Sequence, residues 1–97
     1  MKLIAQPQDI VQYDSKLDKD LDKLPQQILK KLKMWAQLVN HRGITEARKI
    51  PGYHDEPLQG KRKGERSIRL NNAYRAIYTE DKNTIKVTVI EVNKHDY

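Results

Sequence analysis

Apolar residues recur every three or four positions between residues 25 and 39, and this is the strongest periodic pattern in the chain. They are Ile28, Leu29, Leu32, Trp35, Ala36, Leu38 and Val39. This spacing lines them along one face of an α-helix, and that face must cover an apolar surface formed elsewhere in the chain. Pro25 suits the first turn of such a helix, and Gly43 suits the position just beyond its last turn. The pattern therefore predicts an amphipathic helix that ends near Asn40.

A shorter helical pattern precedes this one. Its apolar residues are Leu17, Leu21 and Leu24, and Ser15 is placed to cap it. The two predicted helices meet at Pro25 and should form an antiparallel hairpin. Upstream, residues 9–13 are typical of a short strand, and residues 1–8 either extend that strand or form an N-terminal arm.

Three segments near the C-terminus alternate apolar and polar residues as strands do, namely residues 66–70, 73–78 and 84–92. Asn71 and Asn72 indicate a tight turn between the first two. The adjacent Val89 and Ile90 suggest burial on both faces near the end of the third. The order of elements predicts an α+β fold: an N-terminal strand, a two-helix hairpin and a three-stranded antiparallel meander, with the helices on one face of the sheet.

The length and composition exclude several classes of protein. A chain of 97 residues has room for one hydrophobic core, so we expect a single domain over residues 1–97. No apolar run approaches the roughly 18 residues that a membrane helix needs, and the N-terminus lacks a secretory signal. Cysteine is absent, which excludes disulfides, thiolate zinc sites and cysteine nucleophiles. We therefore expect a cytoplasmic protein with no membrane partner.

Positive charge is concentrated in the middle of the chain. The formal net charge is +6, and residues 41–75 carry nine Lys and Arg against four Asp and Glu, including every Arg. A guanidinium group offers a planar fork that matches phosphate, whereas a Lys ammonium is a solvated point charge. This distribution favours a polyanionic partner, with a solubilising surface as the alternative.

Two of these arginines fall on neighbouring predicted strands. Alternation turns Arg69 and Arg75 away from the apolar residues beside them, toward the sheet face that the helices leave open. The short turn between the strands would make the two side chains neighbours, and like charges repel unless an anion joins them. We therefore predict a phosphate-binding pair. The alternative is two exposed arginines paired with carboxylates, for which Glu65, Glu80 and Asp81 are available.

The three histidines differ in what their surroundings suggest. His41 lies at the end of the long helix, where an imidazolium interacts favourably with the helix dipole, and we interpret it as structural. His54 and His95 lie in the central loop and after the last strand, where each could transfer protons near neutral pH. Together with Asp55 and Asp96 they include metal-ligand types, but no HxxxH or HExxH spacing supports zinc. We expect no metal site and no cofactor.

Three stretches of the chain resemble one protein family. They are KIPGYHDEPLQG at residues 49–60, RSIRL with YRAIY at residues 66–70 and 74–78, and NKHDY at residues 93–97. In this order they resemble the RelE/ParE superfamily of bacterial toxins from type II toxin–antitoxin modules, and within it the HigB and RelE-like mRNA interferases. The resemblance covers residues 9–97. It implies a RelE-like fold and cleavage of mRNA, in most relatives at the ribosomal A site, by metal-free attack of a ribose 2′-hydroxyl on the adjacent phosphate.

The resemblance also implies roles for individual residues. Arg75 aligns with the phosphate-stabilising arginine of the family's YR strand, and Arg69 with a basic position that serves similarly. His95 aligns with a C-terminal histidine proposed as acid or base, and Tyr97 would stack on a splayed base or donate a hydrogen bond. Either Glu56 or His54 would be the base that accepts the 2′-hydroxyl proton, and the sequence leaves that choice open.

The remaining basic residues of the loop have a different expected role. Lys61, Arg62, Lys63 and Arg66 would contact mRNA or rRNA phosphates, or else form a solvated turn. A toxin of this family also implies a cognate antitoxin protein, which would dock on exposed apolar residues of the helical hairpin.

Two other functions compete with the nuclease. A ParE-like toxin has the same fold and inhibits DNA gyrase without cleaving RNA, so it would need no acid–base set. A basic RNA-binding module would need Arg69 and Arg75 but would be indifferent to His95. The histidine-containing tail argues against the ParE-like alternative.

Overall fold

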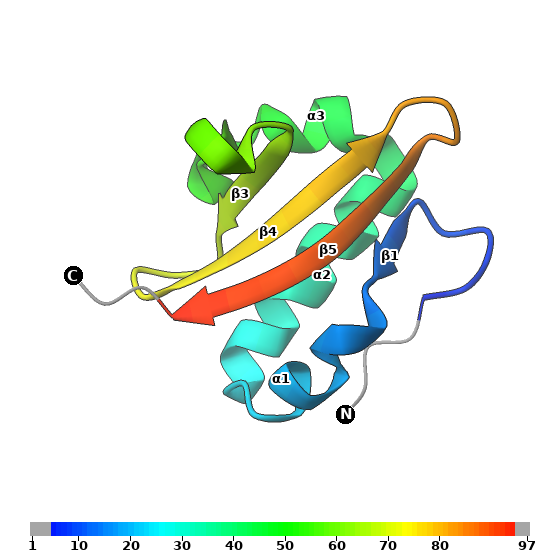
Figure 1. Cartoon of the computed structure of the whole chain (residues 1–97). Helices are drawn as coiled ribbons and strands as arrows, with labels where there is room; N and C mark the ends of the chain where they lie inside the picture. The colour runs from blue at the N-terminus through cyan, green and yellow to red at the C-terminus, as the bar shows by residue number, and fades with distance from the viewer. Residues whose placement is uncertain (1–4, 95–97) are drawn as a thin grey trace.

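A computed structural model describes residues 5–94 and shows a five-stranded sheet with a long helix across one face (Figure 1). The strands are β1 (Val11–Tyr13), β2 (Glu56–Pro57), β3 (Glu65–Arg69), β4 (Tyr74–Asp81) and β5 (Lys86–Lys94). They lie in the order β1-β5-β4-β3-β2. β1 runs parallel to β5, and every other neighbouring pair is antiparallel. The α+β architecture and the C-terminal meander predicted from the sequence are confirmed.

The long helix predicted from the apolar period is α2 (Gln26–Arg42). Gly43 follows it with φ of 86°, a conformation that glycine adopts without strain, and its N–H donates to the carbonyl of Val39 at 2.8 Å. The single helical turn α3 (Ile44–Arg48) then reverses the chain. The shorter N-terminal pattern forms a 3-10 turn (Ser15–Leu17) and α1 (Asp18–Asp22), which lie at one end of the sheet (Figure 1).

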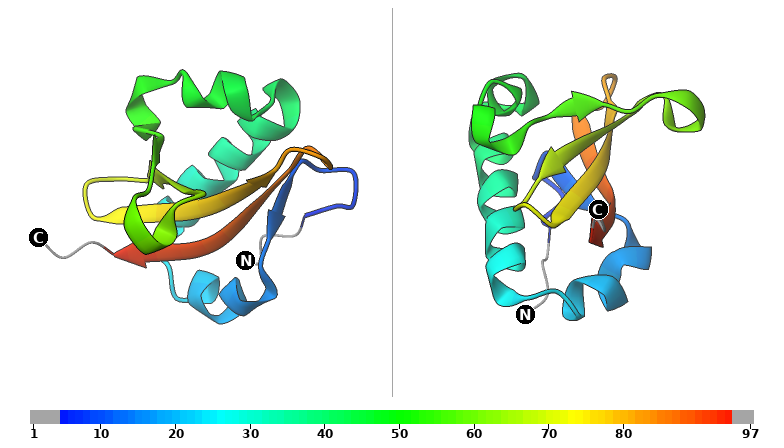
Figure 2. Two further views of the ribbon diagram at one scale, coloured as in Figure 1. Left: turned by 45° about the horizontal axis from the view of Figure 1, so that its top comes forward. Right: turned by 90° about the vertical axis from the view of Figure 1, so that its left-hand side faces the viewer.

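α2 lies across one face of the sheet, as the two views of Figure 2 show, and its apolar residues are buried. The ring of Trp35 in α2 lies 5.3 Å from the ring of Tyr78 in β4, centroid to centroid. Leu32 and Val39, one turn to either side, are fully buried. Burying a side chain of this size contributes roughly 1.5–3 kcal/mol, so this contact fixes which sheet face is internal. The opposite face carries no α-helix within residues 5–94; only the 3-10 turn Gly60–Arg62 reaches over it, through Arg62.

Two local features differ from the sequence-based expectation. Asp14, rather than Ser15, caps the first helical turn, because its carboxylate accepts the backbone N–H of Lys16 at 2.9 Å. The central loop contains β2, a two-residue strand that pairs with β3. A strand of two residues is too short to show an alternating pattern, and one of the two is Pro57, which disfavours a strand prediction. Proline is tolerated here because β2 lies at the edge of the sheet.

The run of Val89 and Ile90 is explained by a β-bulge. Tyr78 pairs with Val89 while the preceding Ile77 pairs with Glu91, which leaves Ile90 as the extra residue on β5. The bulge restores the alternation, so that Val89 and Val92 both reach the core although they are three positions apart. Ile90 itself is only half-buried.

Residues 5–94 contain neither a membrane-spanning helix nor a cluster of metal ligands. This part of the chain contains no helix with the length and apolar character needed to cross a membrane. It also contains no group of three or more His, Asp or Glu side chains close enough together to hold a metal ion.

Candidate functional site

The open face of the sheet carries a row of polar side chains that the strand register brings together. Arg69 of β3 lies directly opposite Arg75 of β4, and Ser67 lies opposite Ile77. Because Tyr78 contacts α2, alternation places Ile77 and Arg75 on the other face. The prediction that the two arginines are cross-strand neighbours on the open face is confirmed.

Glu56 joins this site from the edge strand. Its register partner is Ser67, which places it on the same face. Glu56 Oε1 accepts a hydrogen bond from Nη1 of Arg75 at 3.1 Å, and the two groups form an ion pair across the sheet. The carboxylates suggested from the sequence as partners of Arg69 and Arg75 were Glu65, Glu80 and Asp81, and none of them accepts this bond. The reason is that β2, which carries Glu56, has no signal in the sequence.

Another arginine, Arg62, reaches across the open face from the turn between β2 and β3. Arg62 donates through Nε to Glu65 of β3 at 2.6 Å and through Nη2 to Glu91 of β5 at 3.1 Å. The side-chain amide of Asn93 also donates to Glu91. The hydrogen bonds from Arg62 lower the pKa of the Glu91 carboxyl, and those to Glu91 and Glu65 raise the pKa of Arg62. Arg62 was predicted from the sequence to bind RNA, and no local pattern indicates either of its acidic partners.

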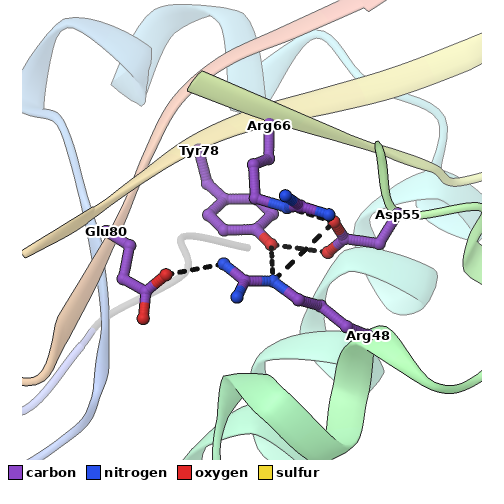
Figure 3. Close-up of polar contacts among 5 residues, drawn as sticks. All are labelled: Arg48, Asp55, Arg66, Tyr78 and Glu80. Carbon is purple, nitrogen blue, oxygen red and sulfur yellow. Dashed lines mark hydrogen bonds and ion pairs between the residues drawn. The ribbon is translucent and has the colours of Figure 1, made fainter. Parts of the chain in front are cut away.

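The face toward α3 carries a different polar cluster, drawn in Figure 3. Asp55, whose side chain is 1% exposed, accepts hydrogen bonds from Nε of Arg66 at 2.6 Å and from the hydroxyl of Tyr78 at 2.5 Å. Arg48 donates through Nε to Tyr78 at 3.2 Å and through Nη2 to Glu80 at 2.6 Å. Burial, and then the bond to Asp55, raise the pKa of the Tyr78 phenol, so that it stays protonated and acts as a donor.

This cluster holds the central loop against the sheet. Asp55 directly precedes Glu56, so its two bonds fix the backbone from which the Glu56 carboxylate reaches Arg75. Arg66 points away from the open face because its register partner is Tyr78. The expected RNA-binding set is therefore divided between the two faces, with Arg62 on one and Arg66 on the other.

The other expected site residues lie around the rim or outside the described residues. Lys61 and Lys63 are exposed in the turn beside Arg62. His54 is exposed and has φ of 45°; its backbone N–H donates to the carbonyl of Pro51 at 3.1 Å, but its side chain forms no hydrogen bond or ion pair within residues 5–94. His95 and Tyr97 lie outside the described residues; the last described residue, Lys94, pairs with Tyr74 at the end of β5 that lies next to Arg75.

The arrangement has the parts that phosphoryl chemistry requires. Two guanidinium groups on one sheet face can bind a phosphate and neutralise charge that develops on it. A half-exposed carboxylate next to them, Glu56, can accept a proton. Arg69 forms no ion pair within residues 5–94, so its charge is available to an anion.

Comparison with known proteins found relatives by structure alone. No protein-family model matches the sequence, and no curated protein matches it. Solved structures do match. The toxin–antitoxin complex RelBE2 from Mycobacterium tuberculosis superposes with a TM-score of 0.67 at 23% identity, over 90% of this chain and 98% of that one.

Two further structures give the same result. YafQ from Escherichia coli superposes with a TM-score of 0.69 at 20% identity, over 88% of this chain and 91% of that one. The archaeal RelE–RelB complex from Pyrococcus horikoshii gives 0.69 at 17% identity, over 90% and 94%. A YoeB/ParE toxin from Agrobacterium tumefaciens is also among the matches. The chain therefore has the fold of the RelE/ParE toxins, which confirms that part of the resemblance, and at these identities the likeness extends to the fold alone.

Proposed function

We propose that this protein is the toxin of a bacterial type II toxin–antitoxin module and a ribosome-dependent endoribonuclease that cleaves mRNA. The observation that carries the proposal is the convergence of Arg69, Arg75 and Glu56 on one open sheet face. The fold shared with RelE and YafQ supports it. A ParE-like protein with the same fold would have no need of a carboxylate and paired guanidinium groups on this face.

In the proposed reaction the ribose 2′-hydroxyl attacks the adjacent phosphorus and the bond to the 5′-oxygen of the next nucleotide breaks. Glu56 accepts the proton of the 2′-hydroxyl, and His95 donates a proton to the leaving 5′-oxygen. The products are a 2′,3′-cyclic phosphate and a 5′-hydroxyl, so atoms and charge balance without water or metal. Arg75 and Arg69 stabilise the additional negative charge on the phosphoryl oxygens.

Glu56 is favoured over His54 as the base on geometric grounds. Its carboxylate is already oriented toward the guanidinium that would hold the phosphate, at 3.1 Å from Nη1 of Arg75. His54 precedes it by two residues and has no such contact within residues 5–94. Tyr97 would stack on an unstacked base next to the cleaved linkage, as aromatic side chains do in single-stranded RNA recognition.

The proposed partners follow from the same surface. Lys61, Arg62 and Lys63 would contact phosphates of mRNA and rRNA, whose binding is independent of sequence and sensitive to salt. We assign Arg66 to the support of the loop rather than to RNA, because its side chain is bound to Asp55 on the other side of the sheet. A cognate antitoxin would restrain the toxin in the cytoplasm, where ribosomes are found.

Primer-extension mapping of cellular transcripts after brief induction tests the proposal. We expect new 5′ ends within translated messages, and we expect the purified reaction on programmed ribosomes to proceed in EDTA. Arg75→Ala should lower cleavage by about 10²–10³-fold, and His95→Ala by about 10²–10⁴-fold. Arg42→Ala, at the exposed end of α2, is the matched control. Growth inhibition without transcript cleavage would instead indicate the gyrase-inhibiting alternative, and binding without cleavage the RNA-binding module.

A further inference from the structure

The turn that follows β2, residues 60–64, is held over the open face by a single side chain. Arg62 reaches from this turn to carboxylates on two different strands, Glu65 on β3 and Glu91 on β5, with β4 between them. The right-hand view of Figure 2 shows the turn projecting from the sheet on the side opposite α2. The side chain of Arg62 therefore crosses β4, the strand that carries Arg75.

Two residues beneath Arg62 are well buried although no α-helix covers this face. Ser67, Ile77 and Glu91 form one row across the three strands. Ser67 is 2% exposed and Ile77 is 7% exposed. The hydroxyl of Ser67 has no hydrogen-bond partner within residues 5–94. A buried hydroxyl without a partner is unfavourable, so this closed arrangement leaves a polar group ready to bind once the row is uncovered.

The Arg62–Glu91 contact contributes little to folding. The side chains of Arg62 and Glu91 are 41% and 34% exposed, and ion pairs at such exposure are screened by water and salt. The geometry of the contact is that of anion recognition, because Nη1 and Nη2 each bond one oxygen of the same carboxylate, at 3.3 and 3.1 Å. Guanidinium binds a phosphate through the same two-pronged geometry.

We propose that Glu91 occupies the position of an RNA backbone phosphate, and that RNA binds by replacing Glu91 as the partner of Arg62. This proposal rests on the proposed function and concerns the regulation of the same site. The site lies one side-chain row along the strands from Arg75, since Glu91 pairs with Ile77 and Asn93 pairs with Arg75. The phosphate would therefore be a neighbour of the one that is cleaved. Exchange would free the turn and expose Ser67 to the ribose–phosphate backbone.

The proposal makes Glu91 an intramolecular competitor of the substrate, so its removal should strengthen RNA binding. The experiment measures the affinity of the full chain for a short single-stranded RNA that is 2′-O-methylated throughout and cannot be cleaved. Glu91→Gln should bind several-fold more tightly than wild type, because no carboxylate then competes for Arg62. The slope of log K against log salt should stay the same, since Arg62 contacts the same phosphate in both proteins.

The matched control is Glu80→Gln, which makes the same charge change and removes an acidic partner of an arginine, Arg48, on the other side of the sheet. It should increase the affinity no more than any remote loss of one negative charge. The double variant Glu91→Gln/Arg62→Gln should not show the increase in RNA affinity. If Glu91→Gln does not fold, Arg62→Gln alone should make the wild-type salt slope shallower by about 0.7.

Equal affinities for Glu91→Gln and Glu80→Gln, or an unchanged slope for Arg62→Gln, would overturn the exchange of Glu91 for phosphate. Cleavage of translated mRNA by the wild type is scored separately, so the proposed function would survive that result. An increase in RNA affinity for Glu91→Gln, together with no cleavage of mRNA by the wild type, would support the phosphate site and refute the proposed nuclease activity. Failure of every variant to bind RNA at low salt would refute both.

Discussion

Arg69 and Arg75 lie directly opposite one another on adjacent antiparallel strands, and both leave the sheet on the face that α2 does not cover. Like charges at directly opposed positions destabilise a sheet, so the pair is retained at a cost to stability. Glu56 contacts Arg75 and so offsets part of that cost, whereas Arg69 forms no ion pair within residues 5–94. A bound phosphate would satisfy both guanidinium groups.

Arg69→Gln should therefore make the protein more stable and less active. Relief of the repulsion should raise the free energy of unfolding by about 0.2–1 kcal/mol at low salt, and the gain should shrink as salt is added. Urea denaturation at two ionic strengths measures this, with Lys33→Gln on the exposed side of α2 as the charge-matched control. A loss of stability for Arg69→Gln would show that Arg69 has a structural role instead.

Glu56→Gln and His54→Gln distinguish the two candidate bases. Because Glu56 is directed at Arg75 and His54 is not, its replacement should lower single-turnover cleavage by about 10²–10⁴-fold. His54→Gln should retain most of the activity. RNA affinity is measured alongside, since Glu56→Gln removes a negative charge beside Arg75 and should not weaken binding. The opposite pattern of rates would assign the base to His54.

Asp55→Asn should destabilise the fold and displace Glu56. The substitution removes the charge that Arg66 and Tyr78 bind in a buried position, at an expected loss of about 2–3 kcal/mol in the free energy of unfolding. Asp22→Asn, at the exposed end of α1, should change it little. A double-mutant cycle with Tyr78→Phe should show coupling, and additive effects would contradict a shared network.

The pKa of Glu91 predicts how the turn over the open face responds to acid. Its hydrogen bonds from Arg62 lower the folded-state pKa below the ordinary value of 4.5, so the stabilisation is complete above pH 4.5 and is lost as the pH falls through the lower folded value. The difference in stability between wild type and Glu91→Gln should therefore be small and constant near neutral pH and should disappear in acid. An NMR titration that places the carboxyl of Glu91 at or above 4.5 would contradict the contact with Arg62.

The sequence determined the elements whose cause is local. The apolar period of α2, the glycine at its end and the alternation of β3, β4 and β5 depend on residues a few positions apart, and these elements form as predicted. The cross-strand pairing of Arg69 and Arg75 also followed, because a short turn fixes the register of the strands that it joins. The side chain of Asn71 closes that turn by accepting the N–H groups of Ala73 and Tyr74.

The partners of the charged residues were decided by tertiary structure. Glu56 lies 19 positions from Arg75, and Glu91 lies 29 positions from Arg62. Neither sequence separation follows from the local helix or strand patterns. β2 forms only because β3 offers an edge to pair with, and Asp55 becomes buried only when α3, β3 and β4 enclose it. An ion pair has no preferred sequence separation, so the identity of each carboxylate beside each arginine depends on how the chain folds in three dimensions.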